Sequence, residues 1–213
     1  MIDKDPLNLV VCGVGGQGNV LVARIIGRAF AKEGYIVSVA DVYGAAQRGG
    51  AVSSYIRVSR ESLWAPVIPH GKAHVVLSFE PLEAIRTLID FGNRETIVIT
   101  NSYPVVPLKV ASGEADYPVI EKIKELLFEL SHKAFFINAT DMVSQLGVRY
   151  LSTFMLGALV GTNILPLNQE RFKETLRESF AAEMIEVNIK AFNLGLESCS
   201  SDVKLTGEKG DCD

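Results

Sequence analysis

Apolar and polar positions switch repeatedly between strand-like and helix-like spacing along this chain. An apolar run at residues 7–12 ends at a glycine and predicts a buried strand. The apolar positions that follow lie three and four residues apart and predict one face of a helix, which Gly34 ends. That face consists of Val22, Ile25, Ile26, Ala29 and Phe30. A second strand is predicted at 35–40, so residues 7–40 indicate a βαβ unit with parallel strands.

The remainder of the chain continues the same alternation. Residues 51–58 alternate between apolar and polar types, which predicts a half-exposed strand, antiparallel to 35–40 because the connection is short. Further strands are predicted at 73–79, 96–100 and 134–137, and a helix should begin at Pro81. Other helices are predicted at 119–130, 151–164, 169–178 and 181–196. The stretch 151–167 is apolar on several helix faces, so it is either enclosed by the domain or part of a permanent interface.

These elements predict an α/β fold with three layers. The expected sheet is doubly wound and mainly parallel, with a Rossmann-like start, an antiparallel addition and C-terminal helices. A chain of 213 residues suits one domain, placed at 1–197. Residues 198–213 show no periodicity and are predicted to form a loosely ordered polar tail.

Composition and charge restrict the class of function. The chain is 48% hydrophobic and 22% charged, which excludes a disordered protein or a disulfide scaffold. A net charge of −4 gives no general attraction to nucleic acid or to an anionic membrane. The stretch 151–167 is too short and too interrupted to span a bilayer, and the acidic N-terminus is unlike a signal peptide. We therefore expect a cytoplasmic protein without membrane or nucleic-acid partners.

A glycine loop is the sharpest motif. Residues 13–18, GVGGQG, lie between a predicted strand and a predicted helix, as a G-x-G-x-x-G phosphate loop requires. Glycines let backbone N–H groups approach a phosphate, and the helix N-terminus adds a favourable dipole. The predicted anion cradle consists of Gly13, Gly15, Gly16, Gln17 and Gly18. The alternative is that the glycines only permit close packing of the helix on the strand.

A second glycine segment, 43–50 (YGAAQRGG), is expected beside the first. Its Arg48 guanidinium is suited to a phosphate or carboxylate. Gly49, Gly50 and Ser54 would complete the adjoining wall. Asp41, at the end of the second predicted strand, could instead hold the ribose of NAD. A hairpin-like turn carrying a surface arginine is equally compatible with this segment.

The two glycine motifs together resemble the gamma-type domain of the 2-oxoacid:acceptor oxidoreductases. That family consists of thiamine-diphosphate, iron–sulfur enzymes that convert a 2-oxo acid and coenzyme A to an acyl-coenzyme A. Residues 78–84 (SFEPLEA) and 155–159 (MLGAL) resemble the small beta subunit of the indolepyruvate oxidoreductases, and the resemblance covers about 7–195. It implies coenzyme A as a ligand, a large catalytic subunit as partner and ferredoxin as acceptor through the complex.

The chain lacks the residues for the family's redox chemistry. No thiamine-diphosphate signature follows Gly210-Asp211, and three scattered cysteines without C-x-x-C cannot ligate a cluster. The expected role is therefore an accessory subunit without metal or catalytic residues of its own, inactive alone. Thiamine diphosphate and the clusters are expected on the partner. Two alternatives remain open: an NAD-binding Rossmann-type oxidoreductase domain and a non-catalytic scaffold.

Overall fold

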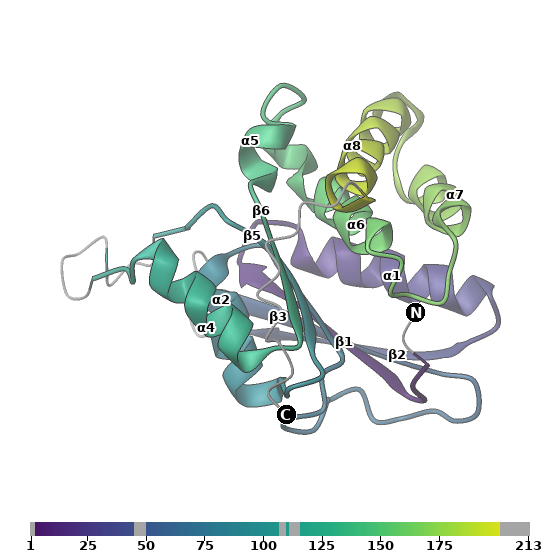
Figure 1. Cartoon of the computed structure of the whole chain (residues 1–213). Coiled ribbons are helices and arrows are strands. Elements are labelled where there is room, and N and C mark those ends of the chain that lie inside the picture. The colour runs from purple at the N-terminus through teal and green to yellow at the C-terminus, as the bar shows by residue number, and fades with distance from the viewer. Residues whose placement is uncertain (1–2, 45–49, 107–109, 111–115, 201–213) are drawn as a thin grey trace.

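A six-stranded mixed sheet lies between two layers of helices (Figure 1). The computed structural model describes residues 3–44, 50–106, 110 and 116–200. The sheet consists of β1 (Leu7–Val14), β2 (Ile36–Tyr43), β3 (Ala51–Ser59), β4 (Val75–Ser78), β5 (Ile97–Asn101) and β6 (Lys133–Ile137). Its strand order is β2-β3-β1-β4-β5-β6. The predicted three-layer α/β fold is confirmed.

The sheet has a parallel part and an antiparallel part. β1, β4, β5 and β6 pair in parallel, whereas β3 pairs antiparallel with both β1 and β2. β1 and β2 therefore run in the same direction, as predicted, but β3 lies between them. The expected antiparallel addition is β3, inserted into the sheet as an interior strand.

The prediction that β3 is half-exposed is wrong. Tyr55 and Arg57 occupy the alternate positions that should face solvent, yet they are only 6% and 7% exposed. The segment that follows β3 covers this face: Arg57 donates to the Ala65 carbonyl over 2.9 Å and lies 5.0 Å from the Trp64 ring centroid. Arg57 Nε also donates to Asn8 Oδ1 at 3.0 Å. Arg57 can thus occupy a buried face because its guanidinium has hydrogen-bond partners, and Tyr55 packs its ring against Phe91.

The helices divide between the two faces. They are α1 (Asn19–Lys32), α2 (Pro81–Phe91), α4 (Ile120–Leu130), α5 (Ala139–Val143), α6 (Leu151–Gly161), α7 (Gln169–Ser179) and α8 (Ala182–Ser200), with a 3₁₀ turn at Val148–Tyr150. α1, α6, α7 and α8 lie on one side, and α2 and α4 on the other (Figure 1). α2 begins at Pro81 as predicted, with the Glu80 carboxylate accepting from the Glu83 N–H at 2.8 Å. Each face thereby has its own apolar core.

The apolar stretch around α6 lies inside the domain. Every residue of α6 is buried, and α8 packs against it over its length. Gly157, Gly161 and Gly195 allow this approach, because a Cβ on any of them would overlap backbone atoms of the opposite helix. The interface alternative for 151–167 is therefore not supported. Residues 201–213, most of the predicted tail, lie outside the described residues.

Candidate functional site

The glycine loop lies where the chain leaves the sheet in two directions. After β1 the chain passes into α1 on one face, and after the neighbouring parallel strand β4 it passes into α2 on the other. Such a switch point, at the carboxyl ends of adjacent strands, is where open α/β sheets bind ligands. The two exits touch: Gln17 Nε2 donates to the Phe79 carbonyl at 3.2 Å.

Gln17 and Gly13 fix the shape of the loop. The Gln17 side chain bridges it, with Oε1 accepting from the Val14 N–H at 2.7 Å while Nε2 is bound to Phe79. A Cβ on Gly13 would lie 2.7 Å from Gln17 Oε1 and 2.9 Å from the Phe79 Cβ. Two predicted cradle residues, Gly13 and Gln17, therefore hold the shape of the loop through contacts with each other and with Phe79.

The N-terminus of α1 provides the anion-binding potential of the loop. Gly18 is its N-cap, in the left-handed region with φ 92°, and no side chain caps the helix. Its first turn contains no acidic residue to offset the dipole. Gly16 also has a positive φ of 99°, and a Cβ there would meet no atom within 4 Å. The approach to the loop is therefore open at Gly16, whereas a Cβ on Gly18 would lie 2.7 Å from the Ser152 Cβ, so Gly18 permits close packing against α6.

Asn19, the first residue of α1, was not singled out from the sequence. Its side chain is 3% exposed, and Nδ2 donates to the Val52 carbonyl at 3.3 Å. Its Oδ1 is buried and has no hydrogen-bond partner within the described part of the chain. A buried acceptor left unpaired costs free energy unless something donates to it. In the sequence, only the position of Asn19 directly after the last loop glycine could have indicated that it belongs to the site.

The second glycine segment joins the first, as predicted. The Gly15 N–H donates to the Gly50 carbonyl at 2.9 Å. The hairpin between β2 and β3 is closed by the Gly44 N–H, which donates to the Ala51 carbonyl at 2.7 Å. Arg48 and Gly49 lie outside the described residues, so their part in the predicted wall stays a prediction.

Ser54 and Asp41 lie deeper in the sheet and contact one another. Ser54 is fully buried, and its Oγ donates to Asp41 Oδ1 at 2.5 Å. Asp41 Oδ2 also lies 3.9 Å from Arg24 Nη2. In a Rossmann fold the second strand adjoins the first, but here β3 separates β2 from β1. The NAD alternative thus loses its geometric basis, because Asp41 already has partners and is not beside β1.

A buried acidic cluster adjoins the loop beyond Phe79. Glu80 is 1% exposed and accepts from the Tyr117 hydroxyl as well as from the Glu83 N–H. Burial, reinforced by the bond to Glu80, raises the pKa of Tyr117. Burial also raises the pKa of Glu83, although the neighbouring Arg86 opposes the shift. Burial raises the pKa of the Cys12 thiol to about 12, so it stays protonated and is not an activated nucleophile.

The part of the chain that the structure describes contains neither a membrane-spanning helix nor a group of metal ligands. No helix in this part is long and apolar enough to cross a membrane. Within the same residues, no group of three or more His, Cys, Asp or Glu side chains is arranged to hold a metal ion.

The fold and the loop together define an α/β domain with a glycine loop and an uncapped helix start at a switch point. A family model described as pyruvate ferredoxin/flavodoxin oxidoreductase matches residues 8–198. The chain belongs to this family, which confirms the predicted resemblance.

Particular relatives agree with this assignment. The chain is 38% identical to the indolepyruvate oxidoreductase subunit IorB of Pyrococcus horikoshii, over 93% of this chain and 98% of that protein. Its fold is similar to a keto/oxoacid ferredoxin oxidoreductase gamma subunit from Geobacter sulfurreducens (TM-score 0.64, 18% identity, 90% of this chain and 97% of that one). It is also similar to a 2-oxoglutarate:ferredoxin oxidoreductase from Magnetococcus marinus (TM-score 0.69, 21% identity), covering 92% of this chain but 31% of that one.

Proposed function

We propose that this chain is the accessory subunit of an indolepyruvate:ferredoxin oxidoreductase. The complex would convert a 2-oxo acid and coenzyme A to an acyl-coenzyme A and CO₂, and the chain would be inactive without its large catalytic subunit. The observation that carries the proposal is the near full-length match to a subunit of that enzyme. The relative from Magnetococcus marinus supports an accessory role for this chain. In that protein, a domain of this fold makes up about a third of a longer chain.

Coenzyme A is the ligand that suits the glycine loop. It carries several phosphate groups, and the uncapped start of α1 offers backbone N–H donors and a positive dipole end to such an anion. Gly16 would admit the phosphate, while Asn19 Oδ1 would accept a hydrogen bond from the ligand or from a water bound with it. Arg48 would add a charge-assisted bond. The Magnetococcus marinus protein is described with coenzyme A and succinyl-CoA bound.

The redox cofactors belong to the partner in this proposal. Oxidative decarboxylation needs the carbanion chemistry of thiamine diphosphate and a cluster path for electrons, both of which cofactors supply. The described residues offer neither a cluster of metal ligands nor an activated thiol, since Cys12 is buried and protonated. Ferredoxin would therefore receive electrons from the large subunit.

The large subunit would dock along the β2 edge. β2 is an edge strand with no Lys, Arg or Pro, and the carboxylate of its one charged residue, Asp41, is engaged by Ser54 and Arg24; such an edge is a site for association. Exposed apolar side chains gather on it and on the segment after β3: Ile36, Val39, Val42, Tyr43, Leu63, Trp64 and Val67. Arg24 and Arg28 flank a groove whose wall is Val37 and Val39. An extended apolar segment with acidic side chains would complement this edge.

Calorimetry on the full chain tests the ligand. Coenzyme A should bind, and Arg48→Ala should weaken it by roughly 1–3 kcal/mol through loss of one charge-assisted bond. Asn19→Leu should weaken it as well, whereas Arg28→Ala, on the exposed face of α1, should not. Micromolar binding of NAD that Asp41→Ala abolishes, in place of coenzyme A binding, would overturn the assignment.

A further inference from the structure

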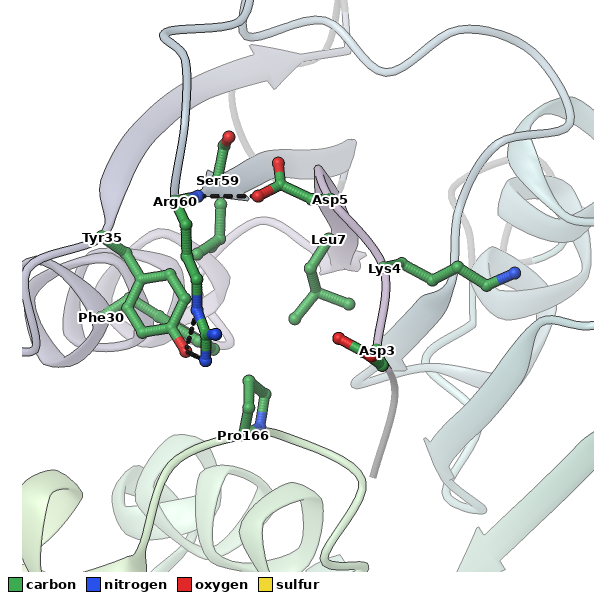
Figure 2. Close-up of a pocket in the computed structure, with 10 residues that line it drawn as sticks. Asp3, Lys4, Asp5, Leu7, Phe30, Tyr35, Ser59, Arg60 and Pro166 are labelled. Atoms are coloured by element: carbon green, nitrogen blue, oxygen red, sulfur yellow. Dashed lines mark hydrogen bonds between the residues drawn. The ribbon is translucent and has the colours of Figure 1, made fainter.

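A cavity lies at the end of β1 opposite to the glycine loop, and Figure 2 shows the residues that line it. It has a volume of about 260 Å³ and opens beside Leu7 at the start of β1 and Ser59 at the end of β3. The glycine loop follows Val14, at the other end of β1. The two sites therefore share no lining residue and would bind different molecules.

The floor of this cavity is apolar and firmly built. Leu7 and Val58 are paired across β1 and β3 and are 3% and 2% exposed. Phe30, from the last turns of α1, is fully buried, and Pro166, from the segment before α7, closes the lower side in Figure 2. These buried side chains form a rigid base, and a ligand would rest its apolar group mainly on the half-buried Pro166 and Tyr35, which also line the cavity.

One wall presents a guanidinium held in a fixed position. Arg60 Nε and Nη2 donate to the Tyr35 hydroxyl oxygen at 3.3 and 2.8 Å, and its Cζ lies 5.2 Å from the Tyr35 ring centroid. The Arg60 backbone N–H donates to Asp5 Oδ2 at 2.9 Å. Among the described residues, no carboxylate lies within ion-pair distance of this guanidinium. Its remaining N–H donors are available to a carboxylate.

The opposite wall presents a carboxylate. Figure 2 shows the Asp3 carboxyl group on the far side of the cavity from the Arg60 guanidinium, with Leu7 and Pro166 between them. Within the described ranges this carboxylate is in no ion pair within 4.0 Å, although the pKa of Arg60, raised most by its hydrogen bond to Tyr35, is raised further by the charges of this carboxylate and of Asp5 acting on the guanidinium. Lys4, the neighbouring cation, extends away from the cavity and is paired with Glu95 at 3.4 Å.

We infer that this cavity binds a free α-amino acid with an apolar side chain. A guanidinium and a carboxylate facing each other across an apolar floor match the carboxylate, ammonium and side chain of such a zwitterion. The volume lies just below the roughly 300 Å³ at which pockets for larger small molecules begin. Because both charged walls are exposed to solvent, the dissociation constant should be weak, about 1 mM or somewhat below.

Titration of the full chain with matched ligands tests the inference. L-Phenylalanine and L-leucine should bind, as followed by calorimetry or by chemical-shift changes. 3-Phenylpropanoate, which lacks the ammonium group, and 2-phenylethylamine, which lacks the carboxylate, should each bind at least tenfold more weakly. Asp3→Asn and Arg60→Gln should each weaken L-phenylalanine by a similar factor, and the matched control Lys4→Gln should not.

Two results would overturn the inference. The first is that no apolar amino acid binds at concentrations up to about 10 mM, which is 10-fold above the expected dissociation constant. The second is equal binding of L-phenylalanine and 3-phenylpropanoate together with no effect of Asp3→Asn, which would make this a simple carboxylate site. Because Asp3 is exposed, its substitution leaves the fold intact, and neither result bears on coenzyme A at the glycine loop.

Discussion

Gly16 and Gly18 share a left-handed backbone, with φ values of 99° and 92°, but differ in their surroundings. A Cβ on Gly16 would meet nothing within 4 Å, whereas a Cβ on Gly18 would lie 2.7 Å from the Ser152 Cβ. Gly16→Ala should therefore lower the free energy of unfolding by about 1–2 kcal/mol, for the backbone alone. Gly18→Ala should cost about 1–3 kcal/mol more, for the added crowding. Urea unfolding of both variants measures the difference, and equal losses would contradict the close contact with α6.

Glu83 should make stability depend on pH. Burial raises its pKa in the folded state, so the native protein binds this proton more tightly than the unfolded chain does. Its contribution is favourable below the unfolded value, near 4.5, and is lost as pH rises through the folded value. Relative to wild type, Glu83→Gln should gain stability as pH rises from 4 to 7. The exposed Glu125→Gln is the control, and parallel curves for wild type and Glu83→Gln would contradict this account.

At the scale of elements, hydrophobic periodicity predicted most of the fold. Apolar residues spaced three and four apart mark α1, and Pro81 marks the start of α2, because these signals act within one segment. These signals did not predict that β3 lies inside the sheet, between β2 and β1. An alternating strand looks the same in the sequence whether one face is in water or is covered by a distant segment, here the one containing Trp64. Burial of β3 therefore depends on contacts that its own residues do not encode.

The candidate site could also be predicted only in outline, because several of its side-chain contacts join segments that are distant in the sequence. The spacing of glycines predicts a phosphate loop between β1 and α1, and the contact of Gly15 with Gly50 confirms that the two glycine segments meet. The spacing could not show that Gln17 braces the loop, nor that Ser54 contacts Asp41 instead of the loop. Asn19 was missed because its place in the sequence does not show that the fold buries its side-chain oxygen without a hydrogen-bond partner among the described residues.

The contact between α6 and α8 depends on glycine. A Cβ on Gly157 would overlap the carbonyl oxygen of Phe192, which belongs to α8 and cannot move without shifting that helix. Gly157→Ala should lower the free energy of unfolding by about 3 kcal/mol or more. Glu186→Ala, a change of an exposed residue of α8, should stay within about 0.5 kcal/mol. Thermal or urea unfolding compares them, and a tolerated Gly157→Ala would show that the helices are not packed this closely.

At the scale of the whole molecule, the β2 edge is where the chain should meet its large subunit. Val42 is 47% exposed on that edge, so Val42→Lys should leave the isolated chain folded but weaken co-purification with the large subunit by tenfold or more. Ile89, 68% exposed on α2, is the matched control, and Ile89→Lys should co-purify normally. Loss of co-purification with Ile89→Lys but not with Val42→Lys would place the interface on the α2 face instead.

The assembled reaction tests the central claim most directly. The measurement is oxidation of indolepyruvate, with coenzyme A and a viologen acceptor, by this chain alone, by the large subunit alone and by the two co-expressed. The account predicts acyl-coenzyme A formation from the co-expressed pair, which should stay together in high salt because apolar contacts are not screened. It predicts no turnover by this chain alone. Turnover by this chain unaided, or a large subunit that is fully active and never associates with it, would contradict the claim.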